Sequence, residues 1–348
     1  AFAQDNKRAD VGALLGHTLY DRAVAAEAEG RSAQEAELTE RFALYDPTGE
    51  LARRWTTPAS LTITTTPPGA RVVVERTAWR AKAPPPPPRE LGAAPLRALE
   101  LERGSYVLTL RAPGRATVRY PALVGRGEKL DLTIALPPAD AVPEGYVYVP
   151  PGRFLFGSAG DEQARRGFFD TVPLHEVRTE GYLIGRTEVT FADWLRFLDA
   201  LPRAERARHL PKAEGRTGGG VRVEERAGGY HLVFRPMDRR YDVRQGERFA
   251  YHARPERVEQ DWLRFPVLGI TGEDAMAYAA WLDRTGRLPG ARLCTDYEWE
   301  RAARGADGRE FPHGDKLNPG DANFDETYNR KEMAPDEVGR YPASQSPF

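Results

Sequence analysis

The sequence is poor in cysteine and has no long apolar run. Cys294 is the only cysteine among 348 residues, which excludes an internal disulfide and any metal site built from clustered cysteines. No stretch approaches the roughly 20 apolar residues that span a bilayer, and the N-terminus lacks a signal-peptide pattern. We therefore expect a soluble, cytoplasmic protein without a membrane partner. Because the chain begins at Ala1 rather than Met, we also expect it to be part of a longer protein.

An excess of charge of either sign is missing as well. Lys and Arg number 50 against 51 for Asp and Glu, so no global field directs the chain to nucleic acid. The six histidines show no metal-ligand spacing such as His-x-x-x-His. No glycine-rich phosphate loop follows a predicted strand, and no His-Arg-Asp or Asp-Phe-Gly kinase motif is present. The sequence therefore gives no sign of a histidine metal site, a phosphate loop or a kinase active site.

The length suggests two or three domains at about 150 residues each. Residues 1–57 predict two amphipathic helices, because Leu15, Leu19 and Ala23 recur at helical spacing before Gly30 and a similar pattern follows it. They are typical of a tetratricopeptide-like helical hairpin. One hairpin buries little apolar surface, so further repeats would precede it. An isolated capping hairpin or linker is an equal alternative.

Residues 58–138 change to the alternating pattern of short strands separated by Gly and Pro, which predicts a small antiparallel all-β sandwich. The turn at residues 67–72, Pro-Pro-Gly-Ala-Arg-Val, resembles that of a PEGA domain, with Pro68 in place of Glu. The proline run 84–88 predicts a polyproline II excursion between strands. It would be a stiff surface loop or, alternatively, a ligand for an aromatic-lined groove.

Residues 145–348 form the third predicted domain, after a proline-rich linker. Thr190 and Thr271 are placed to cap two helices, and the Gly228-Gly229 pair predicts the turn of a β-hairpin. The clearest element is residues 292–305. Thr295 and Glu298 form a capping box, the charges suit the helix dipole, and Gly305 is placed for a left-handed C-terminal residue. Trp299, with two alanines, predicts a narrow buried stripe.

That stretch, Arg-Leu-Cys-Thr-Asp-Tyr-Glu-Trp-Glu-Arg-Ala-Ala-Arg-Gly, resembles the signature of the formylglycine-generating enzyme (sulfatase-modifying factor) family. Other segments resemble the family in the same order: 147–158 (Pro-Pro-Gly-Arg-Phe-Leu-Phe-Gly-Ser at its end), 173–177 with 188–190, 265–281, and 311–315. The resemblance implies an α+β C-type-lectin-like fold with sparse regular structure, for which this chain supplies the N-terminal, incomplete part.

In the family, a cysteine pair late in the domain holds copper and activates oxygen on a substrate cysteine. The chain ends at Phe348, before the region where that pair is expected, so we assign no catalytic or cofactor-binding residue and expect copper only if a missing part carries the pair. Cys294 occupies a position beside the capping Thr. We favour a packed, inert thiol over a thiolate with a lowered pKa.

The resemblance also implies a structural calcium site. Family members use an Asn side chain and the next backbone carbonyl, which match Asn323 and Phe324. Oxygen ligands of this kind suit calcium. The acidic partners are not evident in residues 326–334, so a capped turn without an ion is the alternative.

The order of hairpin, PEGA-like sandwich and formylglycine-generating-enzyme-like domain is similar to bacterial Ser/Thr kinases fused to such a module. We therefore interpret the chain as a non-catalytic binding or sensory module of such a kinase. The partner would be a protein or peptide, or a polypeptide that completes the domain. The alternative is part of a copper-dependent enzyme whose cysteines lie beyond residue 348 or on another chain. A third interpretation is a lectin-like fold that displays variable loops to a partner.

Overall fold

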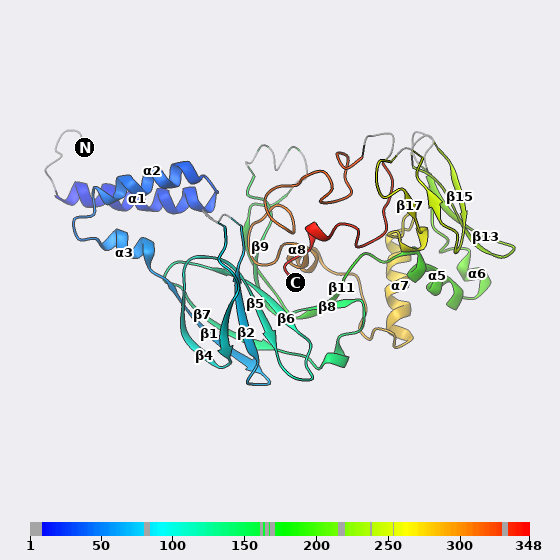
Figure 1. Cartoon of the computed structure of the whole chain (residues 1–348), viewed down its shortest axis with the longest axis horizontal. Coiled ribbons are helices and arrows are strands. Elements are labelled where there is room, and N and C mark those ends of the chain that lie inside the picture. The colour runs from blue at the N-terminus through cyan, green and yellow to red at the C-terminus, as the bar shows by residue number, and fades with distance from the viewer. Residues whose placement is uncertain are drawn as a thin grey trace.

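Helices, a β-rich segment and a mixed α/β segment follow one another along the chain (Figure 1). The computed structural model describes residues 9–79, 84–160, 163, 167, 171–214, 220–236, 239–252, 254–328 and 333–348. The N-terminal helices lie at one end of the long axis and the sheet around β13 (Gly220–Arg226) at the other. The C-terminus lies between them, beside α8 (Asp296–Arg304). Within these ranges, no helix combines the length and apolar character needed to cross a bilayer.

The N-terminal part contains α1 (Ala9–Ala28), α2 (Ser32–Ala43) and α3 (Glu50–Thr56). They share a small core of Leu19, Tyr20, Ala23, Ala26, Leu38, Phe42 and Leu51. The sequence predicts two helices and misses α3, because seven residues are too few to display a helical period. α3 follows Gly49, whose φ is +68°, and the Asp46 carboxylate accepts a 2.8 Å hydrogen bond from the backbone N–H of Ala52.

A cluster of ion pairs connects the N-terminal helices to the β-structure that follows them. The Glu27 carboxylate, at the end of α1, accepts from the Arg126 guanidinium and pairs with Arg103 at 2.8 Å. The Arg126 guanidinium also lies 3.7 Å from the centre of the Trp55 ring and donates to the Trp55 carbonyl. The Glu27 side chain is only 10% exposed, so removing its arginine partners would leave a buried, unpaired charge.

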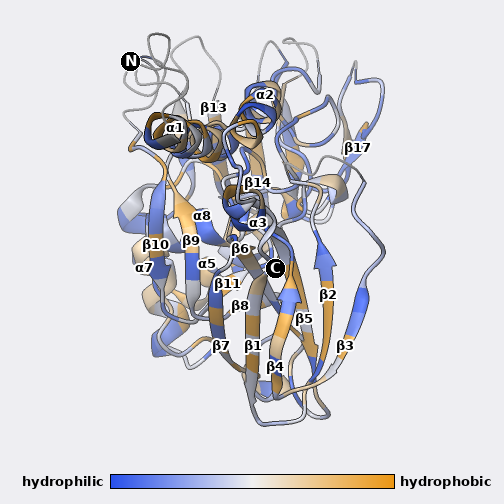
Figure 2. Ribbon diagram, turned by 90° about the vertical axis from the view of Figure 1, so that its left-hand side faces the viewer, coloured by the Kyte–Doolittle hydropathy of each residue, from blue (hydrophilic) through white to orange (hydrophobic). Residues whose placement is uncertain are grey.

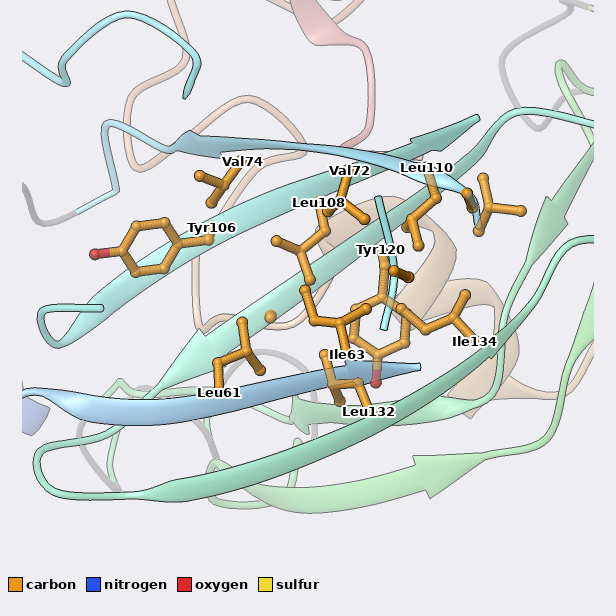
Figure 3. Close-up of a cluster of buried hydrophobic side chains, with 14 of the residues drawn as sticks. Leu61, Ile63, Val72, Val74, Tyr106, Leu108, Leu110, Tyr120, Leu132 and Ile134 are labelled. Carbon is orange, nitrogen blue, oxygen red and sulfur yellow. The ribbon is translucent and has the colours of Figure 1, made fainter. Parts of the chain in front are cut away.

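Two sheets pack face to face over residues 59–135 (Figure 3). The first has the order β4-β1-β7, from β1 (Ala59–Thr66), β4 (Leu96–Leu101) and β7 (Lys129–Ala135). The second has the order β3-β2-β5-β6, from β2 (Arg71–Arg76), β3 (Arg89–Ala93), β5 (Gly104–Arg111) and β6 (Val118–Val124). Buried residues alternate with half-buried ones along β1, and Figure 2 shows hydrophobic and hydrophilic stretches along the strands.

The two inner faces form one core. Leu61 and Ile63 of β1 point toward Val72 and Leu108 of the other sheet, as Figure 3 shows. The expected turn after β1 is present, with Gly69 at φ +87°. Proline residues 84–88 are exposed and have no regular structure between β2 and β3.

The prediction of an antiparallel sandwich is wrong in one strand pair. β1 pairs antiparallel with β4 but parallel with β7, with Leu61 opposite Leu130 and Ile63 opposite Leu132. An alternating pattern reports which face a residue occupies and carries no information on strand direction. β7 begins beside the start of β1, with Lys129 opposite Ser60, and therefore runs in the same direction as β1. An antiparallel neighbour would have to begin at the other end of the sandwich, beside Thr66.

The mixed part begins with two small strand pairs. β8 (Tyr146–Val149) pairs with β11 (Tyr182–Gly185), and β9 (Gly152–Phe156) pairs with β10 (His175–Thr179). A four-stranded sheet follows further along, made of β12 (Lys212–Glu214), β13, β14 (Gly229–Arg235) and β15 (Tyr241–Arg244). The predicted hairpin is confirmed, because β13 pairs with β14. Its turn is Ala227-Gly228, and Gly229 is already the first residue of β14, opposite Arg226. A short pair, β16 (Phe249–Ala250) and β17 (Glu259–Gln260), comes last.

Three helices of this part begin with capping boxes. They are α5 (Phe191–Ala200) with Thr190 and Asp193, α7 (Gly272–Arg284) with Thr271 and Asp274, and α8. The remaining elements are short: α6 (Arg203–Arg206) and the 3-10 turns η1 (Ala139–Ala141), η2 (Trp262–Arg264) and η3 (Pro342–Ser344). α5, α7 and the β13–β15 strands enclose an aromatic core that includes Trp194, Trp262, Phe265 and Trp281. α8 has no residue in it.

Candidate functional site

The candidate site is built around α8, where the longest recognisable motif lies. The Thr295 hydroxyl accepts from the backbone N–H of Glu298 at 3.2 Å, and the Glu298 carboxylate accepts from the backbone N–H of Thr295 at 2.9 Å. The Arg292 guanidinium donates two hydrogen bonds to the same carboxylate, at 2.7 and 2.5 Å. The Arg292 guanidinium, followed by the cap bonds, lowers the pKa of Glu298 from its ordinary 4.5 to about 2. The predicted capping box is therefore confirmed.

The predicted apolar stripe of this helix is wrong. Trp299 is 63% exposed, whereas the one buried residue of α8 is Arg301, at 1% exposure. Arg301 lies two positions from Trp299, which places it on the opposite side of the helix. The composition of the helix favours a small apolar face, but the tertiary contacts bury a cation instead.

Arg301 occupies a polar niche between α8 and the β-strands. Its guanidinium donates to the Thr179 hydroxyl of β10, and Tyr120, Tyr148 and Tyr182 are the nearby groups that stabilise its charge. Burial lowers the pKa of this guanidinium. Gly152 closes the niche, because a Cβ there would lie 2.5 Å from an Arg301 nitrogen. A large side chain at position 152 is therefore excluded.

Gly305 ends α8, though not in the expected left-handed conformation. Its φ is +82° but its ψ is −128°, outside the left-handed helical region. A Cβ at this position would meet Pro347 at 2.9 Å and Pro121 at 3.1 Å. Glycine is thus required here by close packing between α8, the sandwich strand β6 and the C-terminal residues.

Polar contacts tie the end of α8 to β9. The Glu300 carboxylate accepts from the backbone N–H of Gly157 at 2.9 Å and from Arg304. The Arg304 guanidinium also donates to the Gly157 carbonyl at 2.8 Å and to the Arg309 carbonyl at 2.6 Å. All of these groups are partly buried.

These contacts form the floor of a cavity of about 730 Å³, a volume within the range of small-ligand pockets. The cavity lies between the α1–α2 turn and the α8 motif, and its walls include Glu29, Phe156, Ser158, Glu310, Phe311 and Asp315. Carboxylates predominate among the charged groups that line the cavity, and the Arg304 guanidinium is already paired with the Glu300 carboxylate. Such walls suit a polar or cationic occupant better than an anion.

A buried ion pair between Asp307 and Arg309 is joined to the sandwich by a hydrogen bond from Ser105. Asp307, which is fully buried, accepts from Ser105 of β5 at 2.5 Å and from Arg309 at 2.6 Å. Sequence reasoning missed the bond between Ser105 and Asp307, since the two residues lie 202 positions apart and neither belongs to a periodic pattern. The only available signal was the occurrence of three charged residues, Arg304, Asp307 and Arg309, in a glycine-rich stretch.

Cys294 precedes the cap of α8 and is exposed, so the expectation of a packed thiol is wrong. The pKa of this thiol is raised, chiefly by its partial desolvation, and the nearby Glu298 carboxylate acts in the same direction. The thiol therefore lacks the low pKa of an activated nucleophile at neutral pH.

A family model described as "Sulfatase-modifying factor enzyme 1-like domain" matches residues 134–346. The chain belongs to this family. The formylglycine-generating enzyme of Streptomyces coelicolor is 33% identical over 190 residues, which cover 51% of this chain and 52% of that enzyme. The formylglycine-generating enzyme of Mycobacterium tuberculosis is 28% identical over 183 residues, covering 50% of this chain and 56% of that enzyme.

A Ser/Thr protein kinase is also similar to about half of the chain. Pkn1 of Chlamydia trachomatis is 27% identical over 179 residues, which cover 51% of this chain and 22% of the kinase. The chain thus spans about half the length of the formylglycine-generating enzymes that it matches and about a fifth of the kinase.

The copper chemistry of formylglycine-generating enzymes does not fit the residues of this chain. Holding soft Cu(I) requires a pair of thiolates, and the sequence contains the single Cys294. In the described part of the chain, no group of three or more His, Cys, Asp or Glu side chains is arranged to hold a metal. No catalytic step is therefore assigned to this chain.

The residues proposed for calcium lie in a loop near the C-terminal end. The Asn323 amide donates to the Ala334 carbonyl at 2.8 Å, and the Phe324 N–H donates to the Thr327 hydroxyl. The nearby Asp336 carboxylate is already held by Arg254, Gln260, Tyr328 and Tyr341. Calcium takes roughly six to eight oxygens, so the remaining ligands would come from other groups. The calcium site stays a prediction.

The two histidines within the family motifs are both near polar partners. The His175 Nδ1 lies 2.8 Å from the Pro173 carbonyl, and the ring contacts Phe156 edge-on. The His313 Nε2 lies 3.4 Å from the Asp321 carboxylate, and its ring stacks on Phe311. These contacts are those of framework side chains, with His175 at the start of β10 and His313 in the segment that follows α8.

Proposed function

We propose that this chain is a non-catalytic binding or sensory module of a bacterial Ser/Thr protein kinase. The single observation that carries the proposal is the lone, exposed Cys294 with its raised pKa, where the family's oxidation needs a thiolate pair. The similarity to the kinase Pkn1 supports the association with a kinase. As part of a kinase that uses ATP, the module would act in the cytoplasm.

The proposal includes a finer assignment of the three parts. The α1–α2 pair would be a tetratricopeptide-like hairpin, residues 58–138 a PEGA-like domain, and residues 145–348 the N-terminal part of a C-type-lectin-like fold. Two packed sheets and the Pro67-Pro68-Gly69 turn support the second assignment. The long irregular segments between short helices and strand pairs support the third. A protein or peptide partner would bind to the last part.

The alternative function is one part of a copper-dependent formylglycine-generating enzyme whose cysteines lie outside this chain. The observation that favours it is the 33% identity with the Streptomyces coelicolor enzyme over about half of its length. In that case α8 and its surroundings would form part of the wall that positions a substrate peptide.

One experiment separates the two functions. The chain is incubated with copper, oxygen and a Cys-x-Pro-x-Arg peptide, and the aldehyde product is sought by mass spectrometry. We expect no conversion by the isolated chain. Conversion by the isolated chain would refute the non-catalytic function, and conversion that requires a second polypeptide would favour the alternative.

A further inference from the structure

The cavity beside α8 is shared between the N-terminal helices and the domain that the family model matches. Glu29 and Gly30 of the α1–α2 turn form one wall, and residues between Phe156 and Asp315 form the others. Figure 1 shows this turn close to β9. Because the family match covers residues 134–346, the turn adds a wall that the matched domain does not supply.

Ion pairs hold the α1–α2 turn in this position. Glu27, two residues before Glu29, accepts hydrogen bonds from Arg126 and pairs with Arg103, which both belong to the segment that forms the two sheets. Glu29 itself pairs with Arg31, but both side chains are more than half exposed. Such a surface pair is weak, so the Glu29 carboxylate can turn to a cation in the cavity at little cost.

The charges that line the cavity are unbalanced. The four carboxylates of Glu29, Glu300, Glu310 and Asp315 stand against one guanidinium, that of Arg304. Arg304 is paired with Glu300. Glu310 and Asp315 have no ion-pair partner among the described residues. A hollow lined by charges of one sign concentrates their field, so this cavity should attract cations.

Two aromatic rings complete the walls. The Phe156 ring is held by edge-on contacts with Tyr297 and His175, at 4.7 and 5.7 Å between ring centroids. The Phe311 ring stacks on His313. Aromatic rings attract ammonium and guanidinium groups and pack against aliphatic chains. A metal ion would leave these apolar walls unfilled, whereas an organic cation would contact both the rings and the carboxylates.

We propose that this cavity binds an organic cation, an alkyl ammonium or alkyl guanidinium group, that bridges the helical hairpin and the matched domain. This inference rests on the proposed function, for which it names the class of ligand that the module would detect. The cation would lie between Glu29 on one side and Glu310 and Asp315 on the other. Its aliphatic part would pack against Phe156 and Phe311. Because the ligand touches both parts of the chain, its binding should stabilise their mutual arrangement.

Calorimetry with the whole chain tests the binding. One probe is agmatine, a free alkyl guanidinium, and the other is N-acetyl-Ala-Arg-Ala-amide, which carries the same group on a peptide; glutarate is the anionic control. We expect saturable binding of a guanidinium probe that weakens as salt is added, and no binding of glutarate. Tighter binding of the peptide than of agmatine would assign the cation to a peptide partner, and equal or weaker binding to a free compound.

Matched variants locate the site. Glu310→Gln and Glu29→Gln should each weaken binding of the better probe about tenfold. Glu100→Gln, which removes the same charge from an exposed position on β4 outside the cavity, should leave it unchanged. Hydrogen exchange should slow both in the α1–α2 turn and in residues 310–315 when the probe is bound.

Three results would overturn the proposal. They are the absence of binding by both probes, an effect of Glu310→Gln no larger than that of Glu100→Gln, and slower exchange in only one of the two segments. Neither probe contains cysteine, so the binding measurement is separate from the peptide conversion assay. A chain that neither binds the probes nor converts the peptide would lose this site and keep the non-catalytic function.

Discussion

The Glu298 carboxylate joins the cap of α8 to Arg292, so its replacement tests how this helix is held. Glu298→Ala removes the bond to the Thr295 N–H and both bonds from Arg292. Loss of a cap costs about 0.5–2 kcal/mol. The Arg292 side chain is more than half exposed, so its pair adds only about 0–1 kcal/mol. We expect a total loss of about 0.5–3 kcal/mol in the free energy of unfolding.

The pH dependence gives this prediction a second observable. Because the pKa of Glu298 is lowered from 4.5 to about 2 in the folded protein, its ionised form stabilises the fold. That contribution is fully present above pH 4.5 and is lost as the pH falls toward 2. The difference in stability between the parent and Glu298→Gln should therefore be constant from pH 7 down to pH 5 and shrink below that.

The assay is urea unfolding followed by tryptophan fluorescence at several pH values. Thr295→Ala should destabilise the protein by about 0.5–2 kcal/mol as the reciprocal half of the cap. Asp296→Asn is the control for the helix dipole, because it removes a charge from the first turn without touching the capping box. If Glu298→Ala and Thr295→Ala both unfold at the parent's urea concentration, the account of α8 given above is wrong.

Three further predictions concern buried charges and the thiol. Asp307→Ala should cost about 3–5 kcal/mol, because it leaves the Arg309 guanidinium buried and unpaired, whereas Ser105→Ala should cost less; urea unfolding compares them. Glu27→Ala should release the helices from the sandwich, which faster proteolysis between them would show. Alkylation of Cys294 should keep accelerating above pH 9, because the pKa of its thiol is raised above that value; a plateau by pH 9 would contradict this.

Local sequence patterns predicted the helices and strands better than they predicted the contacts between them. The capping boxes at Thr190, Thr271 and Thr295 and the β13–β14 hairpin were predictable, because each depends on a few neighbouring residues with fixed geometry. The parallel pairing of β1 with β7 was not, since it depends on the path of the chain over the whole sandwich. Local sequence carries no record of that path.

In the candidate site, too, the local features were predictable from the sequence and the long-range contacts were not. The sequence located α8 and its cap but assigned the wrong buried face. Helical periodicity assumes that apolar residues face the core, yet here Arg301 faces it and Trp299 does not. Arg301 is tolerated because Thr179 and three tyrosines, from strands far away in sequence, surround it. No pattern within α8 itself indicates those neighbours.

The way α8 is held bears on what its exposed side can do. A helix that depended on Trp299 for its position would shift when that side chain gained a new contact. α8 instead depends on the cap, on Arg301, on the bonds from Glu300 and Arg304 to Gly157, and on the contact of the Tyr297 ring with Phe156. A change at Trp299 should therefore leave the position of the helix unaltered. Because the same helix also lines the cavity next to the α1–α2 turn, the shape of that cavity should be unaltered too.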